Sequence, residues 1–524
     1  MFSSALLLSF MIIVSRLFGF MRYRILAGYF TTQELDLYFA AFRIPDLIFE
    51  VLITGALISS LIPIYIRYQK DKEELSTTIS SIANLITIVM VITICIMSIF
   101  LDKLIPLITP GFTPEKIATV VWYSRILLIG QLPFLITGNF LTGIAQANKS
   151  FLLPAIAPVI YNLSIILVTI AFGASAGLIA PVLGVVLGGV LFFLAQLPIL
   201  FMADFSYTFV IKMTAGLKEF FRVVVPRLVT IVVAQIDATI DLTMTSLLGS
   251  GSYTIFYLAQ HLQLLPVSVV GIAAGQASLP YISELYNEKK TSELAETIIS
   301  TILNLLFLTI PITSFFIFAR TPLIRLFFGG DKFDWDATVL TAITLSFFAL
   351  SLPFHTIYYF LTRCFYAVLD SKTPFFVSVV SIIINTSLSL YFVLVAKLPV
   401  WALAISFSVA MIVNVLLLLI LLYRRIPELD IYYLCKETAK MVGATFISSV
   451  IVYYLTHFLD ELVLDTARTI NVFFLDVIAF SVLFLLYFFI SWLLDIKELY
   501  LITRLLFKAR EYRRKIVEFY SGYE

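Results

Sequence analysis

Apolar segments of about twenty residues or more recur along the whole chain, and short polar loops separate them. A helix needs about 20 mostly apolar residues to cross the hydrocarbon core of a bilayer. Only 13% of the 524 residues are charged, against about 25% in a typical soluble protein. The sequence therefore predicts an all-α polytopic membrane protein. Fourteen segments are predicted to span the membrane: 4–28, 37–66, 78–101, 117–145, 152–172, 177–202, 220–248, 254–284, 295–319, 337–366, 374–395, 400–423, 438–458 and 471–494.

Lysine and arginine residues concentrate in alternate loops, as at 67–72, 289–290 and 424–425. Cytoplasmic loops usually carry this excess of basic residues. All three loops lie on one side if the N-terminus is cytoplasmic, and an even number of helices then places both termini there. The tail from 497 to 524 alternates apolar and basic residues. This pattern favours an amphipathic helix on the inner leaflet, with a solvated tail as the alternative.

An internal repeat is visible in the apolar segments. Residues 38–45 resemble residues 257–266, and residues 60–63 resemble residues 278–280. Six predicted helices separate the two copies, so both copies cross the membrane in the same direction. Paired repeats of this kind are typical of alternating-access transporters. We predict two pseudo-symmetric six-helix lobes at 1–212 and 213–428, two extra helices within 429–496, and a cytoplasmic tail at 497–524.

Several arginines lie inside apolar segments near the N-terminus, among them Arg16, Arg22 and Arg43. A charge at membrane depth costs at least a few kcal/mol, so it usually faces a cavity, a partner or a substrate. Because the guanidinium fork donates two hydrogen bonds and stays protonated, it suits phosphate. These three arginines are therefore predicted to bind a diphosphate. Snorkelling to a headgroup region, or pairing of Arg43 with Asp46 and Glu50, are the structural alternatives.

The second lobe has acidic residues at membrane depth. Asp237 and Asp241 lie one helical turn apart in the segment 220–248. Two such carboxylates cannot both stay charged without a cation or a shared proton. With Asn385 they are predicted to couple Na⁺ or H⁺, and a salt bridge to Arg227 is the alternative. His261 is either a titrating group or a packing histidine.

The motifs of common enzymes are absent from the sequence. There is no P-loop, zinc-protease or nucleophile-elbow signature, and the three cysteines and three histidines form no metal-binding pattern. No polar stretch is long enough for a nucleotide-binding domain. A membrane-embedded glycosyltransferase would need a sizeable outer loop, whereas the loop at about 320–336 is short. We therefore expect a transporter, not an enzyme, driven by an ion gradient, the membrane potential or the gradient of its own substrate.

Three motifs near the N-terminus resemble those of the MurJ/MviN lipid II flippases, which belong to the multidrug/oligosaccharidyl-lipid/polysaccharide exporter superfamily. The motifs are Ser15-Arg16-x-x-Gly19-x-x-Arg22, Asp36-x-x-x-x-Ala41-Phe42-Arg43-x-Pro45 and Gly55-Ala56-x-x-Ser59-Ser60-x-x-Pro63. The resemblance implies a flippase of the bacterial inner membrane. It would move the undecaprenyl-diphosphate-linked peptidoglycan precursor, lipid II, from the inner to the outer leaflet. The last two helices would form a groove for the lipid tail.

The resemblance also implies the residues of the site. Ser15, Arg16, Gly19, Arg22 and Asp36 match the family motifs and are expected to bind substrate. The expected partners are lipid II or a related polyprenyl-diphosphate glycolipid and membrane lipids, without nucleic acid, and the protein is expected to be a monomer.

The chain departs from the family pattern at several positions. Tyr23 stands where an acidic residue is usual, and Phe49, Glu50 and Thr54 replace a basic pair and an acid. His261 matches the cavity arginine of the eighth helix and is predicted to line the site. These differences leave two alternatives open, a flippase for another polyprenyl-diphosphate oligosaccharide and a cation-coupled multidrug exporter.

Overall fold

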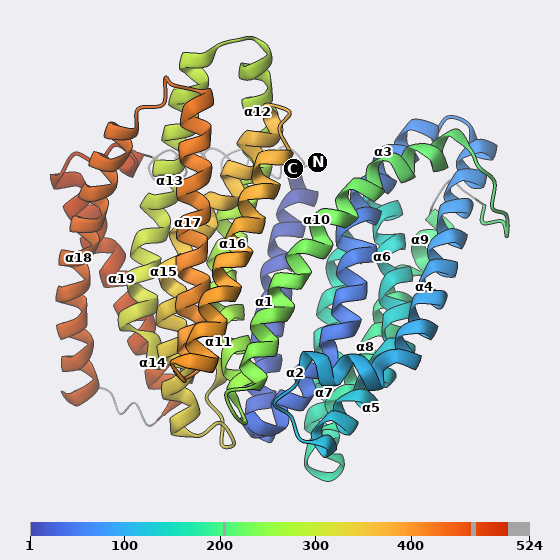
Figure 1. The fold of residues 1–524 in the computed structure, drawn as a ribbon, viewed down its shortest axis with the longest axis horizontal. Coiled ribbons are helices and arrows are strands. Elements are labelled where there is room, and N and C mark those ends of the chain that lie inside the picture. Colours follow the sequence, from blue (N-terminus) through green and yellow to red (C-terminus); the bar gives the residue numbers. More distant parts are fainter. Residues whose placement is uncertain (1, 203–205, 463–467, 501–524) are drawn as a thin grey trace, which may run out of the picture. The chain divides into compact units, whose positions relative to one another are not determined.

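The computed structural model describes residues 2–202, 206–462 and 468–500. Within these ranges the chain forms nineteen α-helices and three π-helical segments (Figure 1). Extended backbone pairing among the described residues is limited to one bridge between Gly330 and Phe333. The prediction of an all-α fold is therefore confirmed.

Eleven helical stretches in the described part of the chain are long and apolar enough to cross a bilayer, and each overlaps one predicted span. The remaining three predictions also fall on helices. The segment 4–28 lies within α1 (Phe2–Tyr29) and the segment 220–248 largely within α10 (Ala215–Ser246). The segment 37–66 covers a longer run, from α2 to α3. The chain is thus a multi-pass membrane protein, while the count of fourteen spans stays a prediction.

The chain divides into two compact units. Unit 1 consists of Met1–Tyr257, Phe327–Thr338 and Leu390–Val400. Its helices, besides α1 and α10, are α2 (Thr32–Phe49), η1 (Glu50–Leu57), α3 (Ile58–Tyr68), α4 (Lys72–Ile108), α5 (Pro114–Gly130), α6 (Leu132–Ala147), α7 (Leu152–Ala176), α8 (Ile179–Gln196), α9 (Pro198–Met202) and η3 (Tyr391–Val395).

The tightest packing in unit 1 joins α7 to α8, and α1 also packs against α7. Glycines on α8 permit this close approach. A Cβ atom on Gly188 would lie 2.9 Å from the carbonyl oxygen of Tyr161, and one on Gly184 would lie 3.0 Å from Cα of Ile165. Small residues at such positions let membrane helices pack through their backbones, so larger side chains here would separate the pair.

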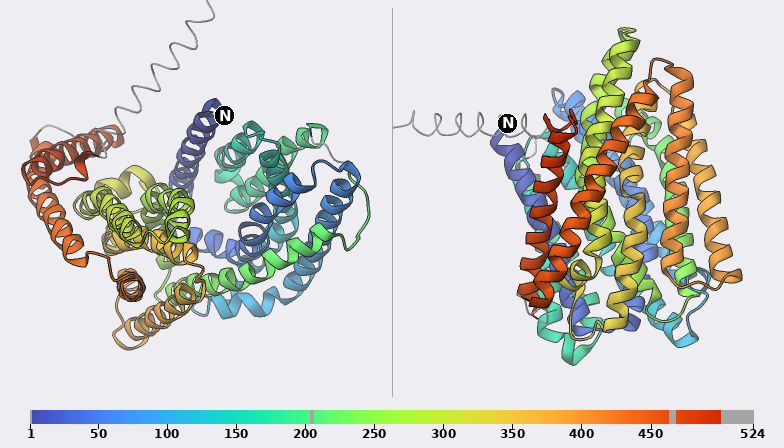
Figure 2. Two further views of the ribbon diagram at one scale, coloured as in Figure 1. Left: turned by 90° about the horizontal axis from the view of Figure 1, so that it is seen from above. Right: turned by 90° about the vertical axis from the view of Figure 1, so that its left-hand side faces the viewer.

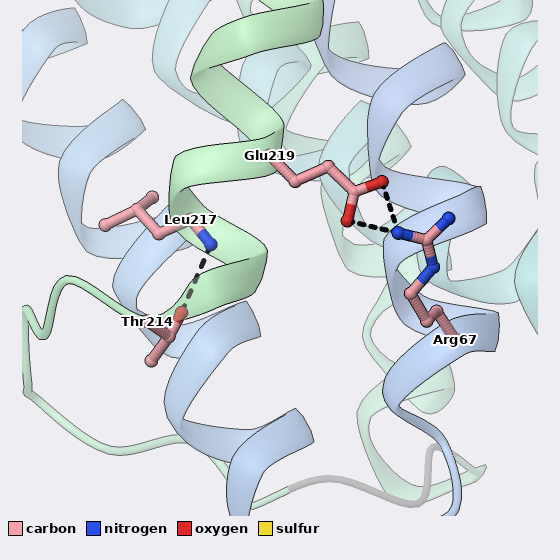
Figure 3. A network of polar contacts seen from close by, with 4 residues as sticks. All are labelled: Arg67, Thr214, Leu217 and Glu219. Carbon is pink, nitrogen blue, oxygen red and sulfur yellow. Dashed lines mark hydrogen bonds and ion pairs between the residues drawn. The ribbon is translucent and has the colours of Figure 1, made fainter.

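The beginning of α10 is anchored within unit 1 (Figure 3). Thr214 caps the helix by accepting a hydrogen bond from the backbone N–H of Leu217 at 3.1 Å. Arg67, in the last turn of α3, donates to both carboxylate oxygens of Glu219 at 2.7 and 2.6 Å. Thr78 on α4 donates to the Thr214 hydroxyl at 2.9 Å. These contacts hold the N-terminal end of α10 against α3 and α4.

Unit 2 consists of Leu258–Leu326, Val339–Ser389 and Trp401–Glu524. Its helices are η2 (Val267–Ile272), α12 (Ala273–Asn287), α13 (Thr291–Phe318), α17 (Trp401–Arg425), α18 (Ile431–Leu462) and α19 (Thr469–Leu493). Four further helices contribute residues to both units: α11 (Ser252–Pro266), α14 (Arg320–Phe328), α15 (Trp335–Ala367) and α16 (Lys372–Leu390). Both α18 and α19 pack against α13 and against each other (Figure 2).

The predicted repeat has structural counterparts. The π-helical segment η1 begins at Glu50, and η2 begins at Val267. The same interval along the chain separates Pro63 from Pro280, which belong to the two copies of the repeat. Because π-helical segments are uncommon, their recurrence at this interval supports the internal repeat.

Candidate functional site

The side chain of Arg22 on α1 is held by an aromatic cluster in unit 1. Its guanidinium carbon lies 4.6 Å from the ring centroid of Tyr23. The ring of Tyr23 is in turn buried against Phe39, Tyr257 and Phe328, at centroid distances of 5.9, 6.3 and 6.4 Å. A cation over an aromatic face gains about 0.5–2 kcal/mol. Tyr23, which stands where the family usually has an acidic residue, therefore orients the side chain of Arg22.

Two buried donors near this cluster have no hydrogen-bond partner in the described structure: Nε of Arg22 and the hydroxyl of Tyr38. The hydroxyl of Tyr161 on α7 accepts a hydrogen bond from Gln131 at 3.0 Å. A buried donor without a partner is costly, and each could donate to an anion. The sequence alone did not single out Tyr38, because a tyrosine in an apolar helix resembles any core residue.

The other predicted residues of α1 fall on two faces of the helix. Ser15, Gly19 and Arg22 follow a spacing of four and three residues, so they share one face. Ser15 and Gly19 are half-buried, and the space beside Gly19 is open, since a Cβ atom there would have no neighbour within 4 Å. Arg16 is exposed and lies about 240° around the helix from Arg22. The structure thus groups the first three residues and sets Arg16 apart.

Arg43 on α2 makes several hydrogen bonds to α10 within unit 1. Its Nε and Nη2 donate to the Thr239 hydroxyl at 3.0 and 2.6 Å. Nη2 also donates to the backbone carbonyl and the side-chain oxygen of Gln235, at 2.6 and 3.0 Å. These contacts give Arg43 a structural role in joining α2 to α10, and its predicted role in binding a diphosphate stays a prediction.

Asp36 on α2 is fully buried, and both oxygens of its carboxylate accept hydrogen bonds at the start of α11. Oδ2 accepts from the backbone N–H of Gly251 at 2.5 Å. Oδ1 accepts from the backbone N–H and the hydroxyl of Thr254, both at 2.8 Å. The first N–H groups of a helix lack intrahelical partners, so Asp36 supplies acceptors from a different helix. Its predicted part in substrate binding is untested.

The predicted ion-coupling residues lie in different units. Asp241, which is buried, and Asp237, which is half-buried, belong to α10 in unit 1, whereas Asn385 is buried on α16 in unit 2. His261 is half-buried on the part of α11 that belongs to unit 2. Among the described residues, no group of three or more histidine, cysteine, aspartate or glutamate side chains could hold a metal ion. The coupling role of these residues therefore stays a prediction.

The fold places the chain among membrane transporters of the multidrug and lipid exporter type. An inward-facing multidrug resistance MATE family transporter of the MOP superfamily matches with a TM-score of 0.66, covering 79% of this chain and 95% of its own. At 16% identity this likeness shows the fold alone. A structure of the lipid II flippase MurJ in an inward closed conformation matches with a TM-score of 0.75 and 26% identity, covering 93% of this chain and 98% of that one.

The model of the family "Lipid II flippase MurJ" matches residues 26–473, and the chain belongs to this family. The probable lipid II flippase MurJ of Rickettsia prowazekii is 28% identical over 396 residues, which cover 74% of this chain and 78% of the relative. The lipid II flippase MurJ of Thermosipho africanus is 28% identical over 463 residues, with coverage of 87% and 91%. The resemblance seen in the N-terminal motifs is therefore confirmed.

Proposed function

We propose that this protein is a flippase that moves lipid II from the inner to the outer leaflet by alternating access and leaves the lipid chemically unchanged. The observation that carries the proposal is the family match, which extends from α1 into α19 on an all-α membrane fold. The fold likeness to exporters of the same superfamily supports a transport cycle. In this proposal the protein is a monomer of the bacterial inner membrane with both termini in the cytoplasm, and Na⁺ or H⁺ couples transport.

The diphosphate of the lipid would bind at the aromatic cluster of unit 1. Arg22 offers a fixed positive charge, because Tyr23 holds its guanidinium group. Its Nε–H and the hydroxyl of Tyr38 are the two buried donors that lack partners. Charge-assisted hydrogen bonds to phosphate are about twice as strong as neutral ones. Ser15 and Gly19, on the same face of α1, would border the bound head group.

Binding of lipid II to the purified protein tests this site. Arg22→Ala and Tyr38→Phe should each weaken binding about tenfold, which corresponds to about 1.4 kcal/mol. Arg22→Lys should restore only part of the affinity, because an ammonium group lacks the planar fork. Arg125→Ala is the matched control, since Arg125 on α5 forms an ion pair with Asp102 on α4.

Two other lipids are compared with lipid II in the same binding assay. Undecaprenyl diphosphate and an unrelated lipid-linked sugar should bind more weakly than lipid II. Equal binding of all diphosphate lipids would contradict the assignment of lipid II as the substrate and would leave the glycan on the lipid open. If Arg22→Ala binds lipid II as tightly as the unaltered protein does, the site at the aromatic cluster is wrong.

A further inference from the structure

A buried acidic side chain lies near the beginning of α19 in unit 2. Asp476 is 5% exposed, and among the described residues neither of its carboxylate oxygens has a hydrogen-bond partner. It is the eighth residue of α19, about 10 Å along the helix at 1.5 Å per residue. A carboxylate buried in a membrane helix is strongly disfavoured unless a partner compensates its charge. The charge of Asp476 therefore requires a compensating partner.

The neighbouring helices do not supply one. Ring contacts set the register of α19 on α13: Phe480 lies 5.3 Å from Phe315, and Tyr487 lies 5.0 Å from Phe307. Asp476 is thus level with the end of α13. Arg320, just beyond that end, donates to Ser346 at 3.2 Å.

Charged side chains lie at both ends of the packed helices. On α13, Glu293 and Glu296 are exposed near the end away from Asp476. On α18, Lys436, Glu437 and Lys440 lie at that same distant end. His457, Asp460 and Glu461 lie at the end of α18 nearer Asp476, and all three are exposed.

Other buried hydroxyl groups lie on the same two helices. Thr445 on α18, and Tyr487 and Ser491 on α19, are buried, and none of their oxygens makes a hydrogen bond of normal geometry in the described structure. Near the far end Glu498 is 7% exposed, and its Oε2 also lacks a partner among the described residues. A hydroxyl can both donate and accept a hydrogen bond. Along the chain, Tyr487 and Ser491 lie between Asp476 and Glu498.

A metal cation does not fit Asp476. Hard cations in proteins take several oxygen ligands, usually including more than one carboxylate, and the described part of the chain holds no group of three or more histidine, cysteine, aspartate or glutamate side chains that could bind a metal ion. A proton needs only one carboxyl oxygen. It also removes the charge that the membrane interior disfavours.

We propose that Asp476 is a proton-binding site that couples proton movement to transport. In the packed state one oxygen of Asp476 carries the proton and the side chain is neutral. When the α18–α19 pair opens to water, the O–H bond breaks, the proton passes to water, and the carboxylate remains. This inference rests on the proposed lipid flipping and identifies one site of its ion coupling.

Infrared spectroscopy of the full-length protein in lipid nanodiscs tests proton binding without any transport. The unaltered protein should show a carbonyl band of a protonated carboxyl group that Asp476→Asn loses. Asp460→Asn, which changes an aspartate near the end of α18, should keep the band. If the band survives in Asp476→Asn, the assignment is overturned. Should Asp476→Asn fail to fold, Asp476→Glu should shift the band, and an unshifted band would overturn the proposal equally.

Flipping of labelled lipid II in proteoliposomes tests the coupling. A gradient of one pH unit biases a one-proton step by up to about tenfold. The unaltered protein and Asp460→Asn should respond to the gradient, whereas Asp476→Asn should flip at one rate with and without it. An equal response of all three proteins refutes the coupling. Absence of flipping in the unaltered protein, with the infrared band present, would instead refute the proposed lipid flipping.

Discussion

The carboxylate of Asp36 offers a sharp test of whether it is structural or binds substrate. It accepts three hydrogen bonds at the start of α11, from the N–H of Gly251 and from the N–H and hydroxyl of Thr254. A hydrogen bond to a charged group is worth about 1.5–3 kcal/mol, and removing one partner of a buried charged group costs about 3–5 kcal/mol. Asp36→Ala should therefore lower the free energy of unfolding by about 4 kcal/mol.

Graded variants separate the individual bonds. Asp36→Asn keeps one acceptor oxygen but loses the charge, so it should cost about half as much as Asp36→Ala. Thr254→Val removes the hydroxyl donor and keeps the backbone N–H, so it should cost about 1 kcal/mol. Glu34→Ala is the matched control, because Glu34 lies in the same turn of α2 and completes an exposed capping box with Thr31. Losing such a cap costs about 1 kcal/mol.

Thermal unfolding of the purified protein in detergent, together with lipid II binding, gives the measurement. The expected order of stability is unaltered protein, then Thr254→Val and Glu34→Ala, then Asp36→Asn, then Asp36→Ala. If Asp36→Ala unfolds like the unaltered protein but loses lipid II, the carboxylate serves the substrate and the structural argument fails.

Two further predictions concern ion pairs in the separate units. Burial pushes the pKa of Asp370 upward, but hydrogen bonds from Thr373 and the charge of Arg425 together lower the pKa below its ordinary value. A lowered pKa stabilises the fold above the unfolded value, about 3.9, and this contribution is lost as the pH falls through the folded value. Thermal unfolding of Asp370→Asn should accordingly depend less on pH below about 5 than that of the unaltered protein, and identical pH profiles would contradict the assignment. In unit 1, a double-mutant cycle on the partly exposed pair of Arg67 and Glu219 should give a coupling free energy below about 1 kcal/mol, because solvent screens such pairs. A larger value would contradict this screening.

The helices themselves could be predicted from the sequence, because crossing a bilayer requires long apolar runs. Each of the eleven apolar stretches that could span a membrane overlaps a predicted span. The internal repeat was also visible, since similar residues recur at offsets of about 220 residues. The division into compact units could not be foreseen from spacing: α10 belongs to unit 1 through tertiary contacts such as those of Arg43 with Gln235 and Thr239.

The partners of charged residues were the less predictable part. An arginine in an apolar helix signals a special environment, but the sequence does not say whether a substrate or a neighbouring helix provides it. Arg43 donates hydrogen bonds to backbone and hydroxyl oxygens of α10, and Asp36 accepts hydrogen bonds from N–H groups at the start of α11. Both sets of partners lie far away along the chain. Asp476 was hidden for the opposite reason, since a single acid near the end of a predicted helix resembles an interfacial residue.

The paired π-helical segments bear on how the chain arose. A π turn differs from an α-helical turn by one additional residue. The interval from the start of η1 at Glu50 to the start of η2 at Val267 equals the interval from Pro63 to Pro280. A single insertion in an ancestral half-length gene, made before that gene was duplicated and fused, accounts for both segments. Two later insertions would have had to arrive separately at matching places. One early insertion therefore explains the equal intervals with fewer steps than two independent insertions do.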